Sequence, residues 1–399
     1  MNDILFWANI IGYLGLILIY VQVVLGSRHI FKVFTKDTVL VNRIHKQIGI
    51  FGILFVLAHP LLEMMNRSES LTWLISPNLN IETETHITFG RFALTLFVLI
   101  WVTSAVIREK IKWRPWKYLH LLSYPILFFT IIHLLEIGTF FGEYAWLRIV
   151  LFVLVAIFVL SVAMRLLAWA GITKLKYKII EKDIVGDIML LKVSPINQSG
   201  IASSKSGQHF FLQSNNYKME HPFSVIRNET NDEGVNTLSF GIRKVGKFWE
   251  EMGMKKIGDI INIDGPYGRF TEEAKNNEDK VVIAAGVGIT PFIELIEKYG
   301  PSISLINCNR NINEVLERDS LKSKVNRYID VLNEYEGAPS DDIKIGLISK
   351  DIIIDTIGEN YKSRKYFICG SPAFVLFLKQ ELYSIDISKQ NVYYEDFGF

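Results

Sequence analysis

Five apolar segments in the N-terminal part of the chain constrain its fold more than any other feature. Each is long enough to form a helix across a bilayer core of about 30 Å, which takes roughly 20 residues. The mean hydropathy of +0.24 averages this apolar part with a more polar part that follows it. The sequence therefore predicts an integral membrane domain over residues 1–173, with spans near 4–25, 46–65, 89–107, 117–137 and 146–170.

Basic residues in the loops set the expected orientation. Loops 26–45 and 108–116 each contain four Lys or Arg residues, whereas 66–88 contains Arg67 alone and 138–145 contains none. Because basic loops stay on the cytoplasmic side, we expect the N-terminus outside and the region after the spans in the cytoplasm. The Lys, Asn and Ile content is typical of a bacterial source, so we expect a bacterial plasma membrane protein.

Four histidines mark the second and fourth spans: His45 and His59, then His120 and His133. Separations of 14 and 13 residues place the two histidines of each helix about 20 Å apart. Both spans run in the same direction, so His45 lies level with His120, and His59 with His133. Each level supplies the two imidazoles that a six-coordinate haem iron needs. We therefore expect two haem b groups with these four metal ligands; the alternative for a single histidine is a bond to a nearby carbonyl.

A spacing of 13 residues does not place His120 and His133 on the same face of an ideal helix. On an ideal helix it leaves His120 and His133 about 140° apart around the axis. Pro125 lies between them and removes a backbone donor, which distorts a helix. We expect that distortion to turn both histidines towards the haems.

One cation lies at the outer end of the third span. Arg91, with His86 nearby, has two interpretations. It is either an arginine that extends to the membrane interface or a charge partner for haem propionates or an anionic acceptor. The second interpretation would make Arg91 a catalytic residue.

Residues 174–275 alternate short strands with polar turns, which is typical of a small antiparallel barrel. The predicted strands are 178–180, 188–193, 209–213, 237–242 and 260–263. A flavin site needs stacking, hydroxyl and cationic groups, which Phe223, Ser224 and Arg243 provide. Taken singly, Ser224 reads equally well as an ordinary strand serine and Arg243 as a surface charge. The local signals are Gly207–Phe210, His221-Pro222-Phe223-Ser224, Gly241-Ile242-Arg243 and Gly265-Pro266-Tyr267-Gly268.

Residues 276–399 alternate strands and helices, as an α/β nucleotide-binding domain does. The apolar strand 280–285 leads into Gly286-Val287-Gly288-Ile289-Thr290-Pro291, where glycines would let a phosphate approach the start of a helix. The alternative is a plain strand-to-helix turn. A second strand, 302–307, leads to Arg310, and a later one, 366–369, ends at Cys369-Gly370. Cys308 and Cys369 are the only cysteines in the sequence, so no disulfide framework is indicated.

Taken in order over residues 40–397, these motifs resemble the NADPH oxidase and ferric reductase superfamily of transmembrane flavocytochromes. The soluble half resembles ferredoxin–NADP reductase-type dehydrogenases. The resemblance implies an α-helical di-haem bundle of about five spans, then an antiparallel β-barrel FAD domain and an α/β NAD(P)-binding domain. Animal members have six spans, and this chain lacks the first.

The resemblance also implies roles for individual residues. The flavin motif falls on His221, Pro222, Phe223, Ser224 and Arg243, followed by Gly265 and Tyr267. The pyridine-nucleotide loop falls on Gly286, Gly288, Thr290 and Pro291, and Cys369-Gly370 matches the nicotinamide-side motif. A terminal Glu-x-Phe, whose ring covers the flavin in the family, falls on Phe397, with Phe399 as its rival. Ser224, Cys369 and Phe397 would then be catalytic.

The implied function is a transmembrane NADPH oxidase that passes electrons from cytosolic NADPH through FAD and two haems to external oxygen, giving superoxide. Arg310 favours NADPH, because NADH sites usually place an acidic residue there; NADH stays the alternative. Two other functions remain: reduction of ferric or cupric chelates, and electron supply to an extracytoplasmic partner. Short outer loops without a cluster of metal ligands favour oxygen. The near-neutral net charge of +2 implies no nucleic-acid partner, and no obligatory subunit is indicated.

Overall fold

The computed structural model describes residues 3–32, 34–138, 144–197, 204–230, 234–338 and 340–395. Contacts divide this chain into two compact units, one up to Leu166 and one from Leu167 onwards. The domain limits at 173 and 275 remain predictions, since they mark changes in sequence pattern and not in contacts.

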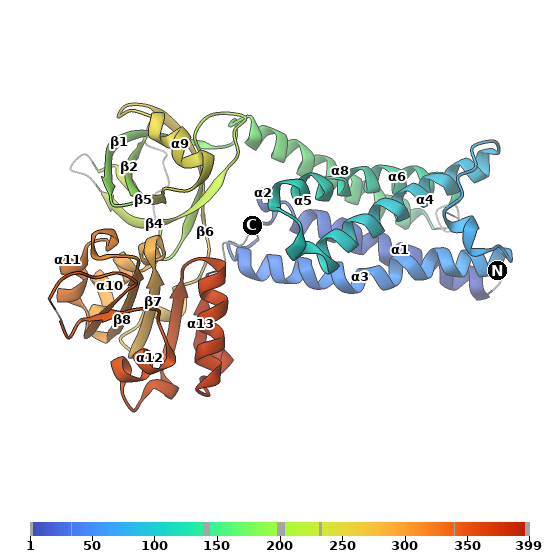
Figure 1. The fold of residues 1–399 in the computed structure, drawn as a ribbon. Coiled ribbons are helices and arrows are strands. Elements are labelled where there is room, and N and C mark those ends of the chain that lie inside the picture. Colours follow the sequence, from blue (N-terminus) through green and yellow to red (C-terminus); the bar gives the residue numbers. More distant parts are fainter. Residues whose placement is uncertain are drawn as a thin grey trace. The chain divides into compact units, whose positions relative to one another are not determined.

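In the described residues, the first unit has five helical segments long and apolar enough to cross a membrane (Figure 1). All five predicted spans are present, and the second and third begin about two helical turns earlier than predicted. The second starts at Thr38 because the Asp37 side chain accepts a hydrogen bond from the Leu40 amide at 2.9 Å, which caps the helix. The helices are α1 (Asp3–Leu25), α3 (Thr38–Arg67), α4 (Glu82–Trp101) with a π-helical end (Val102–Val106), α5 (Trp113–His120) with α6 (Ser123–Ile137), and α8 (Ala145–Trp169).

The fourth span is interrupted at residues 121–122, just before Pro125. Helix α5 ends at His120 and α6 starts at Ser123. Across the break, the Leu122 amide bonds to the Leu119 carbonyl, three residues back, in place of a regular helical bond. The predicted distortion is therefore present, because proline cannot continue the hydrogen-bond ladder.

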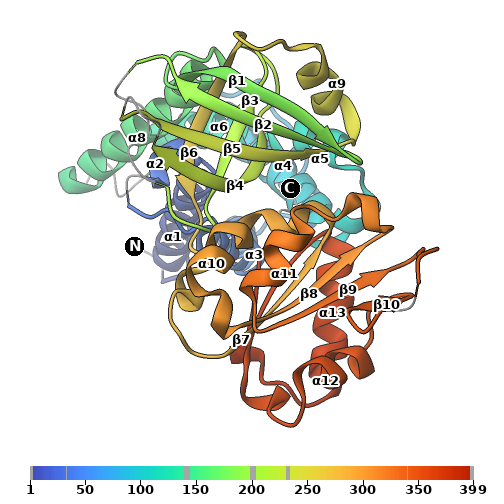
Figure 2. The ribbon, with the colours of Figure 1, turned by 90° about the vertical axis from the view of Figure 1, so that its left-hand side faces the viewer.

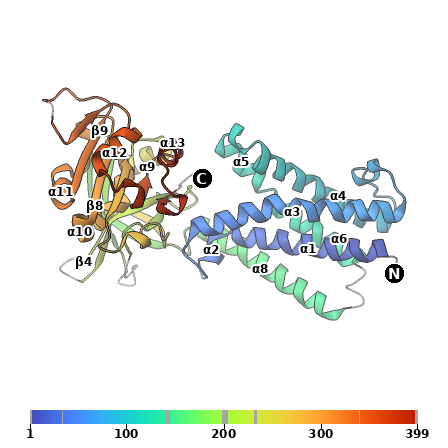
Figure 3. The ribbon, with the colours of Figure 1, turned by 90° about the horizontal axis from the view of Figure 1, so that it is seen from below.

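Close helix pairs build the membrane bundle. Helix α1 lies alongside α3 (Figure 3), and α4 packs against α6. A short helix, α2 (Arg28–Phe31), follows α1, and a 3₁₀ turn (Leu71–Leu74) follows α3. The second and fourth spans, which carry the histidines, are thus each paired with a span that carries none of the four.

A closed six-stranded barrel opens the second unit, with the strand order β1-β2-β5-β4-β3-β6. Its interior is filled by alternating apolar residues such as Phe210, Phe240 and Ile263. All five predicted strands are present. The sequence did not predict the sixth, β4, because Pro222 and the polar run after Ile226 obscure its alternation. The strands are β1 (Leu175–Val185), β2 (Ile188–Pro195), β3 (His209–Gln213), β4 (His221–Thr230), β5 (Asn236–Arg243) and β6 (Ile260–Tyr267), and helix α9 (Gly246–Met254) follows β5.

A six-stranded parallel sheet completes the second unit, in the order β10-β9-β8-β7-β11-β12. Helices α10 and α11 cover one face, and α12 and α13 the other (Figure 2). Val282 faces the first pair and Val281 the second, as the two-residue period of a strand requires. The elements are β7 (Lys280–Ala285), α10 (Ile293–Tyr299), β8 (Ile303–Asn309), α11 (Arg318–Lys324), β9 (Arg327–Leu332), β10 (Ile343–Ile345), α12 (Lys350–Ile357), β11 (Lys365–Cys369), α13 (Pro372–Ser384) and β12 (Val392–Tyr394).

One arginine links the barrel to the parallel-sheet part of this unit. Arg227 of β4 binds Glu297 of α10 at 2.7 Å and Glu317, just before α11, at 2.5 Å. The two carboxylates raise the pKa of Arg227, so it is a permanent cation. This ion-pair network joins the barrel to helices α10 and α11.

Candidate functional site

The structure brings the four span histidines together in two pairs. Ring centres are 6.1 Å apart for His45 and His120, and 6.2 Å apart for His59 and His133. Two imidazoles that bind opposite sides of one metal ion at about 2 Å have ring centres about 6 Å apart. In the described residues no group of three or more His, Cys, Asp or Glu could hold a metal. Paired imidazoles therefore suit an iron whose four other ligands come from a porphyrin.

Main-chain carbonyls fix the orientation of three of these rings. The Nδ1 atom of His45 lies 3.1 Å from the Gln22 carbonyl, that of His59 lies 2.9 Å from Ala8, and that of His133 lies 3.0 Å from His86. A carbonyl only accepts, so each Nδ1 carries the hydrogen and leaves Nε2 free for a metal. The carbonyl bond that the non-metal interpretation required is present, but it uses only one of the two nitrogens.

Gln22 contacts His45, which belongs to the pair predicted on the inner side (His45 and His120), with both its side chain and its main chain. Its side-chain amide donates to the His45 carbonyl at 2.8 Å, while its own carbonyl meets the His45 ring. This reciprocal pair fixes the register of α1 against α3 at the point where His45 projects.

Two glycines make room for the rings of His59 and His133, the outer pair in the predicted orientation. A Cβ atom on Gly12 would lie 2.8 Å from Nδ1 of His59, and one on Gly90 would lie 2.7 Å from Nδ1 of His133. Real Cβ atoms do not approach so closely, so any side chain at either position would push the ring away. The packing around the outer pair thus fits a fixed ligand geometry.

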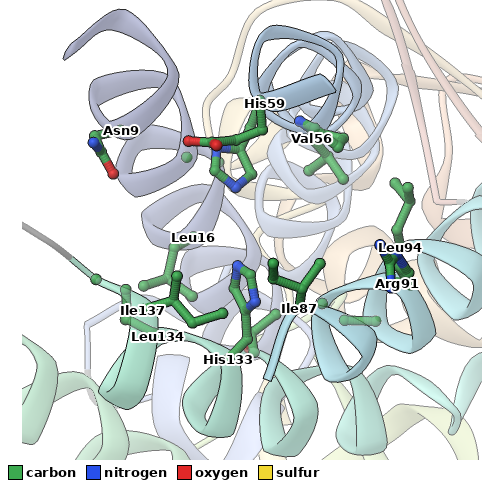
Figure 4. Close-up of a pocket in the computed structure, with 18 of the residues that line it drawn as sticks. Asn9, Leu16, Val56, His59, Ile87, Arg91, Leu94, His133, Leu134 and Ile137 are labelled. Atoms are coloured by element: carbon green, nitrogen blue, oxygen red, sulfur yellow. The ribbon is translucent and has the colours of Figure 1, made fainter. Parts of the chain in front are cut away.

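A cavity of about 320 Å³ lies beside the outer pair, between α1, α3, α4 and α6. His59 and His133 point into it from opposite sides (Figure 4). Its size is in the range of small-molecule sites. The wall is mostly apolar, including Leu16, Val56, Ile87, Leu94, Leu134 and Ile137.

Arg91 lines the same cavity and is buried, with 6% of its surface exposed. It donates to Glu84 at 3.1 Å and to the Thr88 hydroxyl at 3.2 Å, and its guanidinium lies 4.6 Å from the Trp73 ring centre. Glu84 and Trp73 hold the guanidinium among protein groups, and the functional role of Arg91 stays a prediction. Arg91 is a buried, ion-paired cation at the outer histidine level.

The predicted flavin residues on β4 point in alternate directions. The rings of His221 and Phe223 pack on Phe248 of α9, with ring centres 4.7 and 5.2 Å away. Pro222 and the buried Ser224 lie on the other face of the strand. In the sheet, Ser224 is the register partner of His209 on β3. The structure therefore assigns Phe223 a packing contact within the barrel.

Tyr267 and Gly265 also have structural contacts. The Tyr267 phenol is buried and donates to Asp264 at 2.9 Å, and its ring stacks on His209. A Cβ on Gly265 would lie 2.5 Å from the Phe210 ring. Both residues shape the barrel wall next to Ser224.

The nucleotide loop follows β7, whose neighbours are β8 on one side and β11 on the other. In such sheets ligands bind outside the carboxyl ends of the strands, where the strand order reverses. Gly286 has a positive φ of 55°, and a Cβ on Gly288 would collide with the Cys369 carbonyl. The loop continues as a 3₁₀ turn (Gly286–Phe292) before α10, because Pro291 has no amide to donate.

Two barrel residues contact this loop, and one hydrogen bond lies within it. A Cβ on Gly286 would lie 4.0 Å from the Arg243 guanidinium, which also binds Asp187 at 2.9 Å. The Thr290 hydroxyl donates to the Val287 carbonyl, and the Pro291 carbonyl accepts from Ser206 of the barrel. The arrangement places a barrel cation beside a glycine loop that anions can approach.

Cys369 is buried at the carboxyl end of β11, with Gly370 packed against Phe374. Burial, and then the nearby Glu395 carboxylate, raise the pKa of the Cys369 thiol. It is therefore a neutral thiol at physiological pH. Phe397 and its rival Phe399 lie outside the described residues.

Sequence reasoning missed one buried pair near this thiol. Nδ1 of His209 lies 3.1 Å from a Glu395 carboxylate oxygen, and each side chain is 3% exposed. The two residues are 186 positions apart, so no local pattern could pair them. Arg310, by contrast, is exposed at the carboxyl end of β8, as predicted.

Comparisons with known proteins agree with this two-part arrangement. Residues 11–131 match the ferric reductase like transmembrane component family, and residues 282–380 match the oxidoreductase NAD-binding domain family. The chain matches the superfamily of ferric reductase and NADPH oxidase flavocytochromes. It is a membrane protein and an NAD(P)H-dependent electron-transfer oxidoreductase, and its soluble half is a flavoprotein reductase module.

Individual relatives cover parts of this chain. NADH-cytochrome b5 reductase 1 of Dictyostelium discoideum is 24% identical over 55% of this chain and 80% of its own. The flavohemoprotein of Rhizobium meliloti is 26% identical over 36% of this chain but only 38% of its own. The flavohemoglobin structure of Malassezia yamatoensis, with bound FAD and haem, covers 98% of each chain at a TM-score of 0.51 and 17% identity. That likeness concerns the fold alone.

The glycines beside the outer histidines generate a testable prediction. Gly90→Ala and Gly12→Ala should each displace a ring and lower the haem content of the purified protein by about half, although alanine favours helix by about 1 kcal/mol. Gly253→Ala in α9 is the control, because a Cβ there meets nothing within 4 Å and this helical glycine belongs to the second unit. Haem per chain is measured as the pyridine haemochrome. Full haem content in both variants would contradict the assigned role.

Proposed function

We propose that this flavocytochrome moves electrons from a cytosolic nicotinamide cofactor across the membrane to oxygen outside, and releases superoxide. The observation that supports this proposal is the pair of imidazole levels, one near each end of the same membrane helices. Fourteen helical residues separate the levels by about 20 Å. Together they span most of the bilayer core in a chain that also has an NAD-binding domain.

The proposed cofactors are FAD and two haems. When bound, FAD would supply hydride-accepting and one-electron chemistry, and haem iron held by two imidazoles would supply one-electron transfer. His45 and His120 would hold the inner haem, and His59 and His133 the outer one. Because both imidazoles of each pair are committed to iron, an external acceptor must react without binding the metal.

Residues of the second unit would bind and orient the reactants. The amides around Gly286 and Gly288, with Arg243, can neutralise phosphates. Ser224 and Cys369 are the polar groups proposed next to the flavin and the nicotinamide. Glu395, which contacts His209, would lie near Cys369, and Phe397 is proposed to cover the flavin. The contribution of these residues is proximity, since the redox chemistry belongs to the cofactors.

Oxygen is the proposed acceptor because the outer cavity suits a small neutral molecule. Its wall is mostly apolar, and the described residues offer no cluster that would bind a ferric or cupric ion. Arg91 places a buried cation at the same level, and a charge in such surroundings acts more strongly than in water. The cation would stabilise the developing superoxide anion.

The proposal includes a cellular setting. With the basic loops in the cytoplasm, the second unit would be cytosolic and the outer cavity would open towards the exterior of a bacterial plasma membrane. The lipid bilayer and a small-molecule acceptor are the proposed partners, and no obligatory subunit is invoked.

The acceptor is tested with the purified, cofactor-loaded protein. NADPH oxidation in oxygenated buffer should reduce cytochrome c, and superoxide dismutase should abolish most of that reduction. Negligible oxidation in oxygen followed by rapid oxidation on adding ferric citrate would make the protein a metalloreductase. Turnover only with an added surface protein would identify an electron-transfer subunit.

Arg91 and its partner offer a matched pair of variants. Arg91→Leu should slow superoxide formation roughly tenfold, because the charge near the outer haem is lost. Glu84→Gln keeps the arginine and removes the opposing charge, so superoxide formation should be as fast as in the wild type or faster. Both variants should keep two haems and normal flavin reduction. Equal slowing in both would assign the ion pair a structural role only.

Arg310 is the proposed determinant of nucleotide choice. It follows β8, where a cation can pair with the 2′-phosphate of NADPH. Arg310→Ala should raise KM for NADPH about tenfold, the size of one charge-assisted contact, and leave KM for NADH nearly unchanged. NADH is the internal control. An equal change for both nucleotides would make Arg310 a surface charge without a specificity role.

A further inference from the structure

The ring nitrogen of His120 meets a different kind of partner from those of the other three span histidines. Its Nδ1 lies 3.3 Å from the hydroxyl oxygen of Ser104, whereas the others meet main-chain carbonyls at 2.9–3.1 Å. The same hydroxyl oxygen accepts a hydrogen bond from the Trp116 indole at 3.1 Å. The inner pair is thus asymmetric: a carbonyl supports His45, and a shared hydroxyl supports His120.

Local structure places Ser104 against this ring. Ser104 lies in the π-helical turn Val102–Val106, closed by a bond from the Ile107 amide to the Val102 carbonyl at 3.0 Å. Such turns are rare and occur frequently at functional sites. The Trp116 ring stacks on His120, with ring centres 4.9 Å apart. The Arg108 guanidinium lies 4.4 Å from the centre of the Trp116 ring. The indole is therefore held between a cation and the histidine.

The direction of these bonds follows from the proposed ligation. If Nε2 of His120 binds iron, its Nδ1 carries the hydrogen and Ser104 must accept it. The serine oxygen then accepts from two N–H groups at once, His120 and Trp116. An oxygen that already accepts one hydrogen bond is a weaker acceptor for a second, which agrees with the longer distance to His120.

The strength of this bond controls how much electron density the imidazole gives to iron. A strong Nδ1–H bond makes the ring a better donor and favours ferric iron, whereas a weak bond favours ferrous iron. We propose that Ser104 and Trp116 tune the reduction potential of the inner haem through His120, with Trp116 keeping that potential high by occupying the serine oxygen. The inference rests on the proposed function, because it requires a haem at this level. Both residues are positioning residues and not catalytic ones.

The test is a potentiometric titration of the purified, full-length protein, followed by haem absorbance. Ser104→Ala removes the acceptor, so the inner midpoint potential should rise. Trp116→Phe removes the competing donor but keeps a ring, so the same potential should fall. Each shift should correspond to a roughly threefold to tenfold change in the haem reduction equilibrium. The outer haem should titrate unchanged in both variants.

Thr103→Val is the matched control, because Thr103 lies in the same turn but its hydroxyl bonds to the Leu99 and Ile100 carbonyls. It should leave both potentials unchanged. Low-temperature EPR of the ferric haems gives a second readout, in which only the inner signal should change. If Ser104→Ala loses the inner haem, Trp116→Phe decides the question.

Unchanged potentials in both variants, or shifts in the same direction, would overturn the inference while two haems remain bound. A wild-type protein without two haems would overturn the proposed function instead. The haem content of each sample, measured before titration, separates these two outcomes.

Discussion

The membrane unit depends on the cost of placing imidazoles in hydrocarbon. A ring nitrogen without a partner is expensive there, so each span histidine must find one from another helix. Three of them find carbonyls that already belong to helical ladders, and the fourth finds a serine hydroxyl. These bonds require close helix contact, and close contact explains why Gly12 and Gly90 stand opposite the rings. The pairing of α1 with α3 and of α4 with α6 follows from the same requirement.

Much of this arrangement could be predicted from the sequence. Hydropathy located the five spans, and histidine spacing with Pro125 predicted both pairs, because helix geometry converts sequence distance into position. Strands β3 and β7 were predicted to the residue, since apolar runs between turns define them. The three-residue strands β10 and β12 carry too few residues for a pattern, and the pairing of β9, β10 and β12 depends on neighbours far along the chain.

What the sequence could not supply is the set of tertiary partners. Nothing near Gly12 indicates that it faces His59, and Glu395 is too far from His209 for any local rule. Arg91 was predicted at the right level, but its bond to Glu84 and its burial under Trp73 depend on how a loop folds back. For Phe223, the motif predicts flavin stacking, and the structure adds a packing partner, Phe248, that no local pattern indicated.

The two carbonyls that α1 offers to α3 have a genetic consequence. Ala8 and Gln22 are themselves 14 positions apart, the same interval as His45 and His59. In the antiparallel helices, each carbonyl therefore lies level with its histidine. A carbonyl is supplied by any amino acid, so the acceptor at position 8 does not depend on side-chain chemistry, although Ala8 is fully buried and a larger side chain there would disturb the packing. Inserting or deleting one residue between Ala8 and Gln22 turns one of the two carbonyls by about 100° away from its histidine. The length of this stretch is therefore under stricter constraint than the identity of its acceptor residues.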